Sequence, residues 1–218
     1  MISMQNFLIT LVLFLFSLFV SAQEVPEKFT LDKGTWSLGG SLSIGGAHAN
    51  NNDQFSANQY DNFSFNVRPD IGYFFADNFQ AGAQLGYGFS KSSFERATID
   101  ENRNNSLAFS PYLRKFFSLG SKFAISLTGS LEYSIHQTDE YTDDIHVGQR
   151  RSESYGVSAQ PGIFFLLNEK VSLNANIGSL YYTHSKDSRD GEDTQFYNQY
   201  GLNASLNNVW LGIRYYIN

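Results

Sequence analysis

The sequence lacks cysteine altogether, and only four prolines and 17% charged residues occur among its 218 positions. Without cysteine the chain can form neither a disulfide scaffold, nor a thiolate zinc site, nor a cysteine nucleophile. Basic residues are also in the minority, since 15 Lys and Arg stand against 21 Asp and Glu. The resulting net charge of −6 excludes the basic surface that nucleic-acid binding requires. The low charge content accompanies 16% aromatic residues, a composition that argues against disorder.

The longest apolar run is short and lies near the N-terminus. Phe7 to Val20 is 14 residues long, whereas a membrane-spanning helix needs about 20. The run matches the apolar region of a secretory signal, and Val20 and Ala22 supply the small residues of a cleavage site. We therefore expect residues 1–22 to be a cleaved signal peptide and residues 23–33 a short periplasmic segment. No Lys or Arg precedes the run, so an uncleaved anchor is the alternative.

The remaining chain is a series of segments in which apolar and polar residues alternate. Four begin with a bulky apolar residue: Trp36–Ile44, Phe79–Tyr87, Phe123–Leu131 and Val171–Ile177. Four others share a frame that ends in an apolar pair, the first three after a proline: Pro69–Phe75, Pro111–Phe117, Pro161–Leu167 and Leu211–Ile217. Alternation with a period of two predicts strands rather than helices. The two series together predict eight strands.

The links between these segments alternate in length. Short links follow the second series, at 76–78, 118–122 and 168–170. Long polar links follow the first series, at 48–61, 91–105, 137–152 and 184–198. Short turns at one end and long loops at the other are typical of a bacterial outer-membrane barrel, with its turns in the periplasm and its loops outside.

Side-chain volume predicts which face of the strands points outward. Along each predicted strand, the polar residues have small or hydrogen-bonding side chains, as at Ser37, Gln80 and Ser126. The apolar residues that alternate with them have large side chains, as at Leu85 and Leu127. The interior of an eight-stranded barrel is only wide enough for side chains to fill it, so the bulky set must face out, toward lipid. Aromatic residues near the strand ends are then candidates for interfacial girdles: Trp36, Tyr73, Phe74, Tyr133, Tyr181 and Tyr215. A soluble, lipocalin-like barrel is the alternative.

These features resemble the eight-stranded outer-membrane β-barrel family, which includes the transmembrane domain of OmpA and the OmpX-type proteins. The resemblance covers residues 34–218 and rests on periodicity and composition. It implies an all-β, eight-stranded antiparallel up-and-down transmembrane barrel in the bacterial outer membrane, with both termini in the periplasm. It also implies a monomer whose partners are outer-membrane lipid, the barrel-assembly machinery and periplasmic chaperones. In the family the last strand carries the assembly signal, and here Ile213, Tyr215 and Ile217 hold its outward positions.

Two features disturb the regular pattern of strands. Pro69, Pro111 and Pro161 lie inside predicted strands, where a closed barrel has no free edge for a missing donor. Their equal distance from the turns indicates either bulges or one repeated rim feature. In the last strand the alternation changes phase, and a β-bulge near Asn207 and Asn208 would restore it.

Charged residues are scarce on the inward phase of the strands. They are Arg68, Asp70, Arg114, Glu132 and Arg214. Because buried charges must be paired, we expect an ion-pair network in which Glu132 neutralises inward arginines and closes the lumen. A polar ring lining a narrow ion path is the alternative.

Glu132, Ser134 and His136 supply an acid, a nucleophile and a base on one inward face. Residues two apart on a strand lie about 6.8 Å from each other, which stretches the required hydrogen bonds. We therefore expect no enzyme and no catalytic residue, with a lipid-modifying hydrolase as a remote alternative.

The four long links carry the whole net charge of the chain, with 13 acidic against seven basic residues. This predicts a hydrated, repulsive rim, or a surface that recognises a cationic partner or anionic lipid through divalent ions. The densest clusters, 143–146 and 187–193, lack the spacing of a calcium loop, so neither a metal site nor a cofactor is expected. The sequence thus favours a structural or interaction protein with acidic loops. A narrow porin-like channel for ions or small solutes is the alternative.

Overall fold

The structure is a computed structural model, and it describes residues 29–53, 56–94, 100–189, 193–203 and 210–217. Within these ranges the regular structure is entirely β. No helix there is long and apolar enough to span a membrane. The predicted signal peptide at residues 1–22 and the predicted bulge at Asn207 and Asn208 lie outside the described residues.

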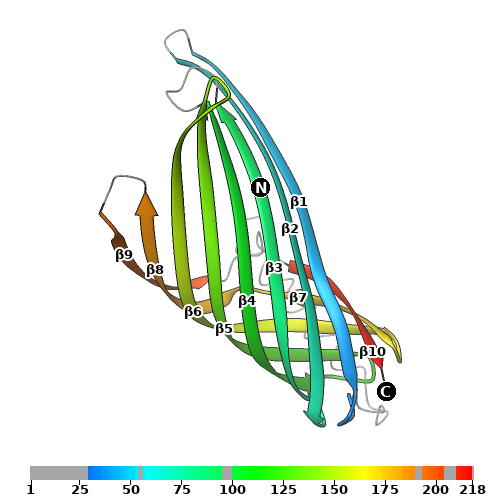
Figure 1. Cartoon of the computed structure of the whole chain (residues 1–218). Coiled ribbons are helices and arrows are strands. Elements are labelled where there is room, and N and C mark those ends of the chain that lie inside the picture. The colour runs from blue at the N-terminus through cyan, green and yellow to red at the C-terminus, as the bar shows by residue number, and fades with distance from the viewer. Residues whose placement is uncertain (1–28, 54–55, 95–99, 190–192, 204–209, 218) are drawn as a thin grey trace, which may run out of the picture.

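The described residues form ten strands, which Figure 1 labels in chain order. They are β1 (Trp36–Asp53), β2 (Ser56–Ala76), β3 (Phe79–Phe94), β4 (Glu101–Ser118), β5 (Phe123–Thr142), β6 (Ile145–Asn168), β7 (Val171–Asn176), β8 (Ser179–Arg189), β9 (Gln195–Asn203) and β10 (Trp210–Ile217).

Eight of these strands close into a ring. Each strand from β1 to β7 pairs antiparallel with the next, and β10 joins β7 to β1. The closing seam runs from the pair Trp36–Ile217 to the pair Ser41–Gly212. The predicted eight-stranded antiparallel up-and-down barrel is therefore confirmed. Closure pairs β10 with the first part of β1, Trp36–Ser41, whose backbone groups an open sheet would leave unpaired on that side.

Where the sequence predicts a single seventh strand, the structure has β7 and β8, both paired with β6. The break falls at Ile177 and Gly178, where Gly178 has a φ of 75°, a conformation that glycine adopts at little cost. Pro161 lies opposite, and its carbonyl accepts a hydrogen bond from the Ile177 N–H. β8 and β9 form a hairpin on the outer half of β6, and this hairpin diverges from β1 (Figure 1).

Side chains follow the predicted phase. Leu85 and Leu127 on the outer face are 59% and 51% exposed, whereas Ser37 and Gln80 on the inner face are fully buried. Aromatic pairs mark both edges of the apolar exterior: the rings of Trp36 and Tyr73 lie 5.0 Å apart near the turns, and those of Tyr133 and Tyr155 lie 4.9 Å apart farther up.

Two of the predicted girdle residues do not belong to the outer face. Phe74 is completely buried inside the barrel. Tyr181 pairs with Ser158, whose hydroxyl bonds to Ser130 on the inner face. Phe74 was misassigned because it belongs to an adjacent apolar pair with Phe75, of which a strand can turn only one member outward.

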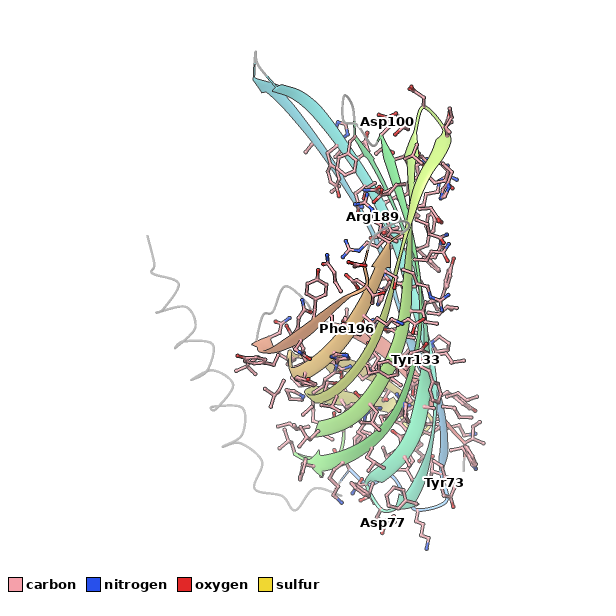
Figure 2. The ribbon with its side chains drawn as sticks, turned by 60° about the vertical axis from the view of Figure 1, so that its left-hand side comes forward. Tyr73, Asp77, Asp100, Tyr133, Arg189 and Phe196 are labelled. Atoms are coloured by element: carbon pink, nitrogen blue, oxygen red, sulfur yellow. The ribbon has the colours of Figure 1, made fainter. Side chains whose placement is uncertain are left out.

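The three short links are turns, as predicted, but most of the residues of the long links belong to strands. β5 continues to Thr142 and β6 begins at Ile145, so their connection is the two-residue turn of Asp143 and Asp144. Both turn residues have positive φ, 50° and 62°, as in the type I′ turn that suits the twist of a hairpin. Figure 2 shows Tyr73 and Asp77 toward the turn end, Tyr133 near mid-height and Asp100 close to the hairpin end.

Two of the strand prolines interrupt pairing without changing the register. β2 and β3 pair at Val67–Tyr87 and again at Asp70–Gln84, in the same register, with Pro69 between. β4 and β5 likewise keep one register on either side of Pro111. Each proline faces outward, and its missing donor removes a rung of the ladder. Of the two explanations that the sequence left open, the bulge is therefore wrong for Pro69 and Pro111.

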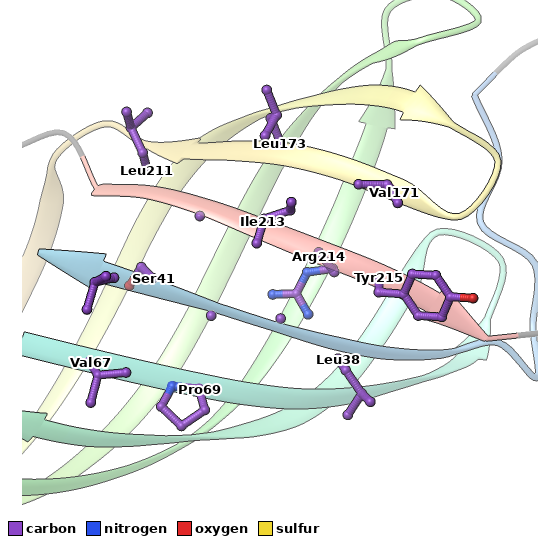
Figure 3. A pocket seen from close by; sticks show the side chains of 14 residues that line it. Leu38, Ser41, Val67, Pro69, Val171, Leu173, Leu211, Ile213, Arg214 and Tyr215 are labelled. Carbon is purple, nitrogen blue, oxygen red and sulfur yellow. The ribbon is translucent and has the colours of Figure 1, made fainter.

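A shallow apolar groove of about 750 Å³ lies on the outer face over the seam between β1 and β10 (Figure 3). Gly40 and Pro69 pair across β1 and β2 at its floor. Aliphatic side chains such as Leu38, Leu211 and Ile213 form its walls. An apolar surface of this kind suits contact with hydrocarbon chains.

Leu127→Arg should destabilise the barrel by about 2–4 kcal/mol, because Leu127 lies midway between the aromatic pairs of Phe123 and Tyr133 on a lipid-facing strand. Val147→Arg is the matched control, since Val147 is also an exposed apolar residue, 54% accessible, but belongs to the hairpin beyond Tyr133. Urea unfolding in lipid vesicles measures both. Equal losses for the two variants would refute the outward, membrane-facing assignment of Leu127.

Candidate functional site: a plugged lumen beneath a polar cavity

The turn end of the barrel is filled by aromatic side chains. Phe74, Phe116, Phe164 and Tyr216 come from β2, β4, β6 and β10, and each is at most 2% exposed. The Phe116 ring lies 4.8 Å from that of Phe164 and 5.6 Å from that of Phe74, which in turn is 6.2 Å from Tyr216. The cluster thus reaches across the lumen and forms a plug.

The segment before β1 completes this plug from below. Phe29 is 2% exposed, and its ring lies 6.2 Å from that of Phe116. The Phe29 N–H donates to the Gly120 carbonyl at 2.8 Å. Leu31 exchanges hydrogen bonds with Asn78 in two directions, through its N–H and its carbonyl. The described part of the predicted segment 23–33 is therefore held against the turns.

A buried ion pair lies directly above the plug. The Arg214 guanidinium donates to Asp70 at 2.6 Å, with side chains 2% and 5% exposed. These two residues are the cross-strand neighbours of Gly39, on β10 and β2 respectively. A Cβ at Gly39 would lie 3.0 Å from the Asp70 carboxylate and 3.1 Å from the Arg214 guanidinium carbon. The glycine thus lets the two charges meet across β1.

Tyr112 on β4 reaches the same carboxylate along the inner wall, over the intervening strand β3. Its hydroxyl donates to Asp70 at 3.0 Å. The ring crosses Gly82 and Gly72, which continue the row of Tyr112 over β3 and β2. A Cβ at Gly82 would lie 2.5 Å from the Tyr112 ring, so no other residue fits there without displacement.

Arg114 is the second buried arginine, and it has a different set of partners. Its Nε donates to Thr128 at 2.8 Å and its Nη1 to Gln80 at 3.4 Å, both cross-strand neighbours of Arg114. The guanidinium carbon lies 4.7 Å above the Tyr112 ring, a cation–π contact. Gln80 in turn donates to Ser37, which also accepts from Arg214. The two arginines therefore belong to one hydrogen-bonded network.

A polar cavity of about 80 Å³ lies above this network. Its lining comes from seven of the eight ring strands and consists of Ser41, Arg68, Gln84, Ser110, Tyr112, Arg114, Thr128, Ser130, Glu132, Gln160 and Asn176. Three buried atoms in and below this layer, Asn176 Oδ1, Ser126 Oγ and Arg214 Nε, have no hydrogen-bond partner among the described residues.

The structure distributes the five predicted network residues over two levels. Arg214, Asp70 and Arg114 lie in the network above the plug, while Arg68 and Glu132 line the cavity. Glu132 is exposed and accepts a hydrogen bond from Ser110 at 3.3 Å. The carboxylate that pairs with a buried arginine is therefore that of Asp70. This corrects the expectation that Glu132 neutralises the buried arginines.

Glu132, Ser134 and His136 lie on β5 and differ in their exposure. Ser134 is 3% exposed, whereas Glu132 and His136 are exposed. Within the described part of the chain, no hydrogen bond joins the three side chains.

The plug is the functional element that sequence reasoning missed. Its signal was present, because Phe74, Phe116 and Tyr216 are each the first member of the apolar pair near a turn. An adjacent apolar pair breaks the alternation, and one member must therefore face inward.

The outer hairpins carry ion pairs on both faces. Glu101 accepts from Lys91 at 2.6 Å and from Arg103 at 2.5 Å. Partial burial raises the pKa of Glu101, but these two cations outweigh it and lower the pKa below its ordinary value. On the inner face, Arg150 pairs with Asp187 at 2.5 Å and Arg189 with Glu140 at 2.7 Å.

A hollow of about 370 Å³ at the hairpin end gathers acidic residues: Asp61, Asp100, Glu101, Asp143 and Asp144, beside Ser93, Phe94 and Tyr141. One of these carboxylates, that of Asp100, accepts a hydrogen bond from the Asp143 N–H at 2.7 Å. Among the described residues no group of three or more His, Asp or Glu is arranged to hold a metal ion.

Asp70→Asn should cost about 3–5 kcal/mol of unfolding free energy, because it leaves Arg214 buried without a counter-charge. Glu132→Gln is the control. It removes a carboxylate from the same lumen, but an exposed one whose partner is a neutral hydroxyl, so a much smaller loss is expected. Denaturant unfolding in micelles compares the two. A larger loss for Glu132→Gln would show that the structural role belongs to Glu132 instead.

The Arg150–Asp187 pair should weaken in acid. Partial burial raises the pKa of Asp187, but hydrogen bonds from Ser152 and Arg150 prevail and lower it. A lowered folded-state pKa stabilises the hairpin above the ordinary aspartate pKa of about 3.9, and this stabilisation disappears as the pH falls through the lowered value. Hydrogen exchange of β8 should therefore accelerate below about pH 4 relative to neighbouring strands. Asp187→Asn should abolish this pH dependence, and an unchanged profile in that variant would contradict the assignment.

Comparison with known proteins identifies the fold. No protein-family model matches the sequence, and no curated protein matches it. Among solved structures, the outer membrane protein OprG from Pseudomonas aeruginosa superposes with a TM-score of 0.54 at 12% identity, covering 86% of this chain and 97% of OprG.

Two other outer-membrane structures match less closely. A major outer membrane protein from Thermus thermophilus gives a TM-score of 0.45 at 11% identity, covering 84% of this chain and 99% of that one. Neisserial surface protein A gives 0.42 at 14% identity, covering 84% and 97%. The closed ring of eight antiparallel strands, its apolar exterior and the superposition on OprG lead to one conclusion. The chain has the fold of the eight-stranded outer-membrane β-barrel proteins.

Proposed function

We propose that this protein is a sealed outer-membrane barrel that anchors charged hairpins at the cell surface, where they contact extracellular partners. In this arrangement the turns, the segment before β1 and the end of β10 face the periplasm, and the tips of the hairpins face outward. This orientation is supported by the short turns at one end and the long polar hairpins at the other.

The plug is the observation that carries the proposal. Phe74, Phe116, Phe164 and Tyr216 fill the turn end, and the Arg214–Asp70 pair lies directly above them. A solute crossing the barrel would have to displace both layers. Because interiors are close-packed and a buried pair resists separation, the resting lumen offers no continuous path.

The outer surface is the remaining candidate for specific contacts. Several of its carboxylates are neutralised by bases, as in the Arg150–Asp187 and Arg189–Glu140 pairs. The hollow around Asp100, Asp143 and Asp144 concentrates negative charge, because its described lining contains acidic residues but neither Lys nor Arg. Such a surface favours basic partners, and its attraction weakens with salt.

The terminal strand fits the predicted role in assembly. Ile213, Tyr215 and Ile217 are 57%, 45% and 44% exposed on the outer face of β10. They are accessible before lipid covers the barrel, so recognition by the assembly machinery and by periplasmic chaperones is part of the proposal. Within the described residues the closed ring leaves no unpaired strand at its turn end, which supports a monomer. No catalytic step is assigned to the chain.

Conductance across a planar bilayer tests the sealed barrel. The purified protein should insert without stepwise currents, whereas Phe74→Ala combined with Phe116→Ala should produce openings, because two of the four plug rings are then removed. Phe75→Ala combined with Phe117→Ala is the matched control, since these neighbouring residues face outward. Steady stepwise conductance of the unaltered monomer would overturn the sealed barrel in favour of a narrow channel.

A further inference from the structure

We propose that the polar cavity above the plug is a binding site for a small carboxylate that enters from the hairpin end. The proposal goes beyond the anchoring role, because it assigns a ligand to the lumen itself. It rests on three observations: an excess of buried positive charge, unused donors on Arg114 and a cavity that these donors line.

The buried charges do not balance among the described residues. Two buried guanidiniums, those of Arg114 and Arg214, stand against one buried carboxylate, that of Asp70. The Asp70 carboxylate is committed to Arg214 at 2.6 Å and to the Tyr112 hydroxyl at 3.0 Å. A guanidinium stays protonated even when buried, so its charge cannot be removed by titration.

Arg114 is the residue that this imbalance leaves without an anion. It is 6% exposed, and among the described residues no carboxylate lies within 4 Å of its guanidinium. Its protein partners are neutral: Thr128, Gln80 and the rings of Tyr112 and Phe164. A buried cation with only neutral partners carries an unmet desolvation cost, which a bound anion offsets.

The unused donors of Arg114 open onto the cavity. Its guanidinium has five N–H donors, and two of them have protein acceptors among the described residues. Arg114 lines the cavity together with Arg68 and the hydroxyl groups of Thr128 and Ser130. A planar guanidinium fork matches the two oxygens of a carboxylate, which can accept parallel hydrogen bonds.

The volume of the cavity and the charge of Glu132 determine which acids can bind. About 80 Å³ is the space of roughly three water molecules, which suits a small acid such as formate or acetate better than a bulky one. Glu132 belongs to the same lining, and its negative charge opposes an incoming anion. The guanidinium of Arg114 therefore favours binding of a small carboxylate, whereas the carboxylate of Glu132 weakens it.

Titration of the folded protein in micelles with sodium formate tests the site at constant ionic strength, monitored by calorimetry and by the NMR signals of arginine Nε. Formate should bind saturably and shift the Arg114 signal, while pivalate, which has the same charge but is too large, should not. Arg114→Gln should weaken formate binding at least about tenfold, as expected for the loss of a charge-assisted hydrogen bond. Glu132→Gln should tighten it several-fold, because a repelling charge is removed.

The opposite signs of the two variants keep the test decisive if Arg114→Gln folds poorly. Glu132 is exposed and has one neutral hydrogen-bond partner among the described residues, so its variant should fold like the parent. The proposal is overturned if formate does not bind, if pivalate binds equally well, or if Glu132→Gln leaves the affinity unchanged or lowers it.

Discussion

The narrow interior of an eight-stranded ring is the constraint on which the other features of this protein depend. A ring of this size has an interior just wide enough for side chains to fill, so large inward residues here have small residues beside them on neighbouring strands. The Tyr112 ring lies against the inner wall over β3 and β2 because Gly82 and Gly72 continue its row. Arg214 reaches Asp70 because Gly39 separates them. The large apolar side chains therefore do not fit inside and lie on the outer face. This makes the exterior hydrophobic, as contact with lipid requires.

The same constraint explains how charge is distributed along the barrel axis. At the turn end aromatic rings fill the lumen, and charge is tolerated only as a closely bonded pair above them. Higher up, where Glu132 is exposed and the cavity begins, side chains have more room and water can approach. Beyond Tyr133 and Tyr155, strands continue as polar hairpins whose ion pairs are partly exposed to solvent. Polarity therefore rises steadily from the plug to the tips.

The fold could be predicted from the sequence because strand periodicity and the side-chain volume of each phase are local properties. The partners of the inward arginines could not, since pairing across a barrel depends on register. Asp70 and Arg214 are neighbours only because both pair with Gly39 on β1. The sequence does not predict the register in which β1 and β10 pair. The split of the seventh strand escaped prediction for a related reason, because it depends on Pro161 lying opposite Ile177 and Gly178. Phe74, by contrast, had a local signal in the adjacent apolar pair.

The segment before β1 has a consequence for the order of assembly. Its anchor Phe29 packs against Phe116, and the ring cluster that it covers includes Tyr216 from the last strand. This surface is complete only after β10 has paired with β1, although Phe29 is the first of these residues to be synthesised. The segment's own partners, Phe116, Gly120 and Asn78, precede β10 in the chain, so the segment can dock before the plug that it covers is complete. Until β10 closes the ring, the plug lacks Tyr216 and the lumen is open at the turn end. The lumen is therefore sealed only in the last step of folding.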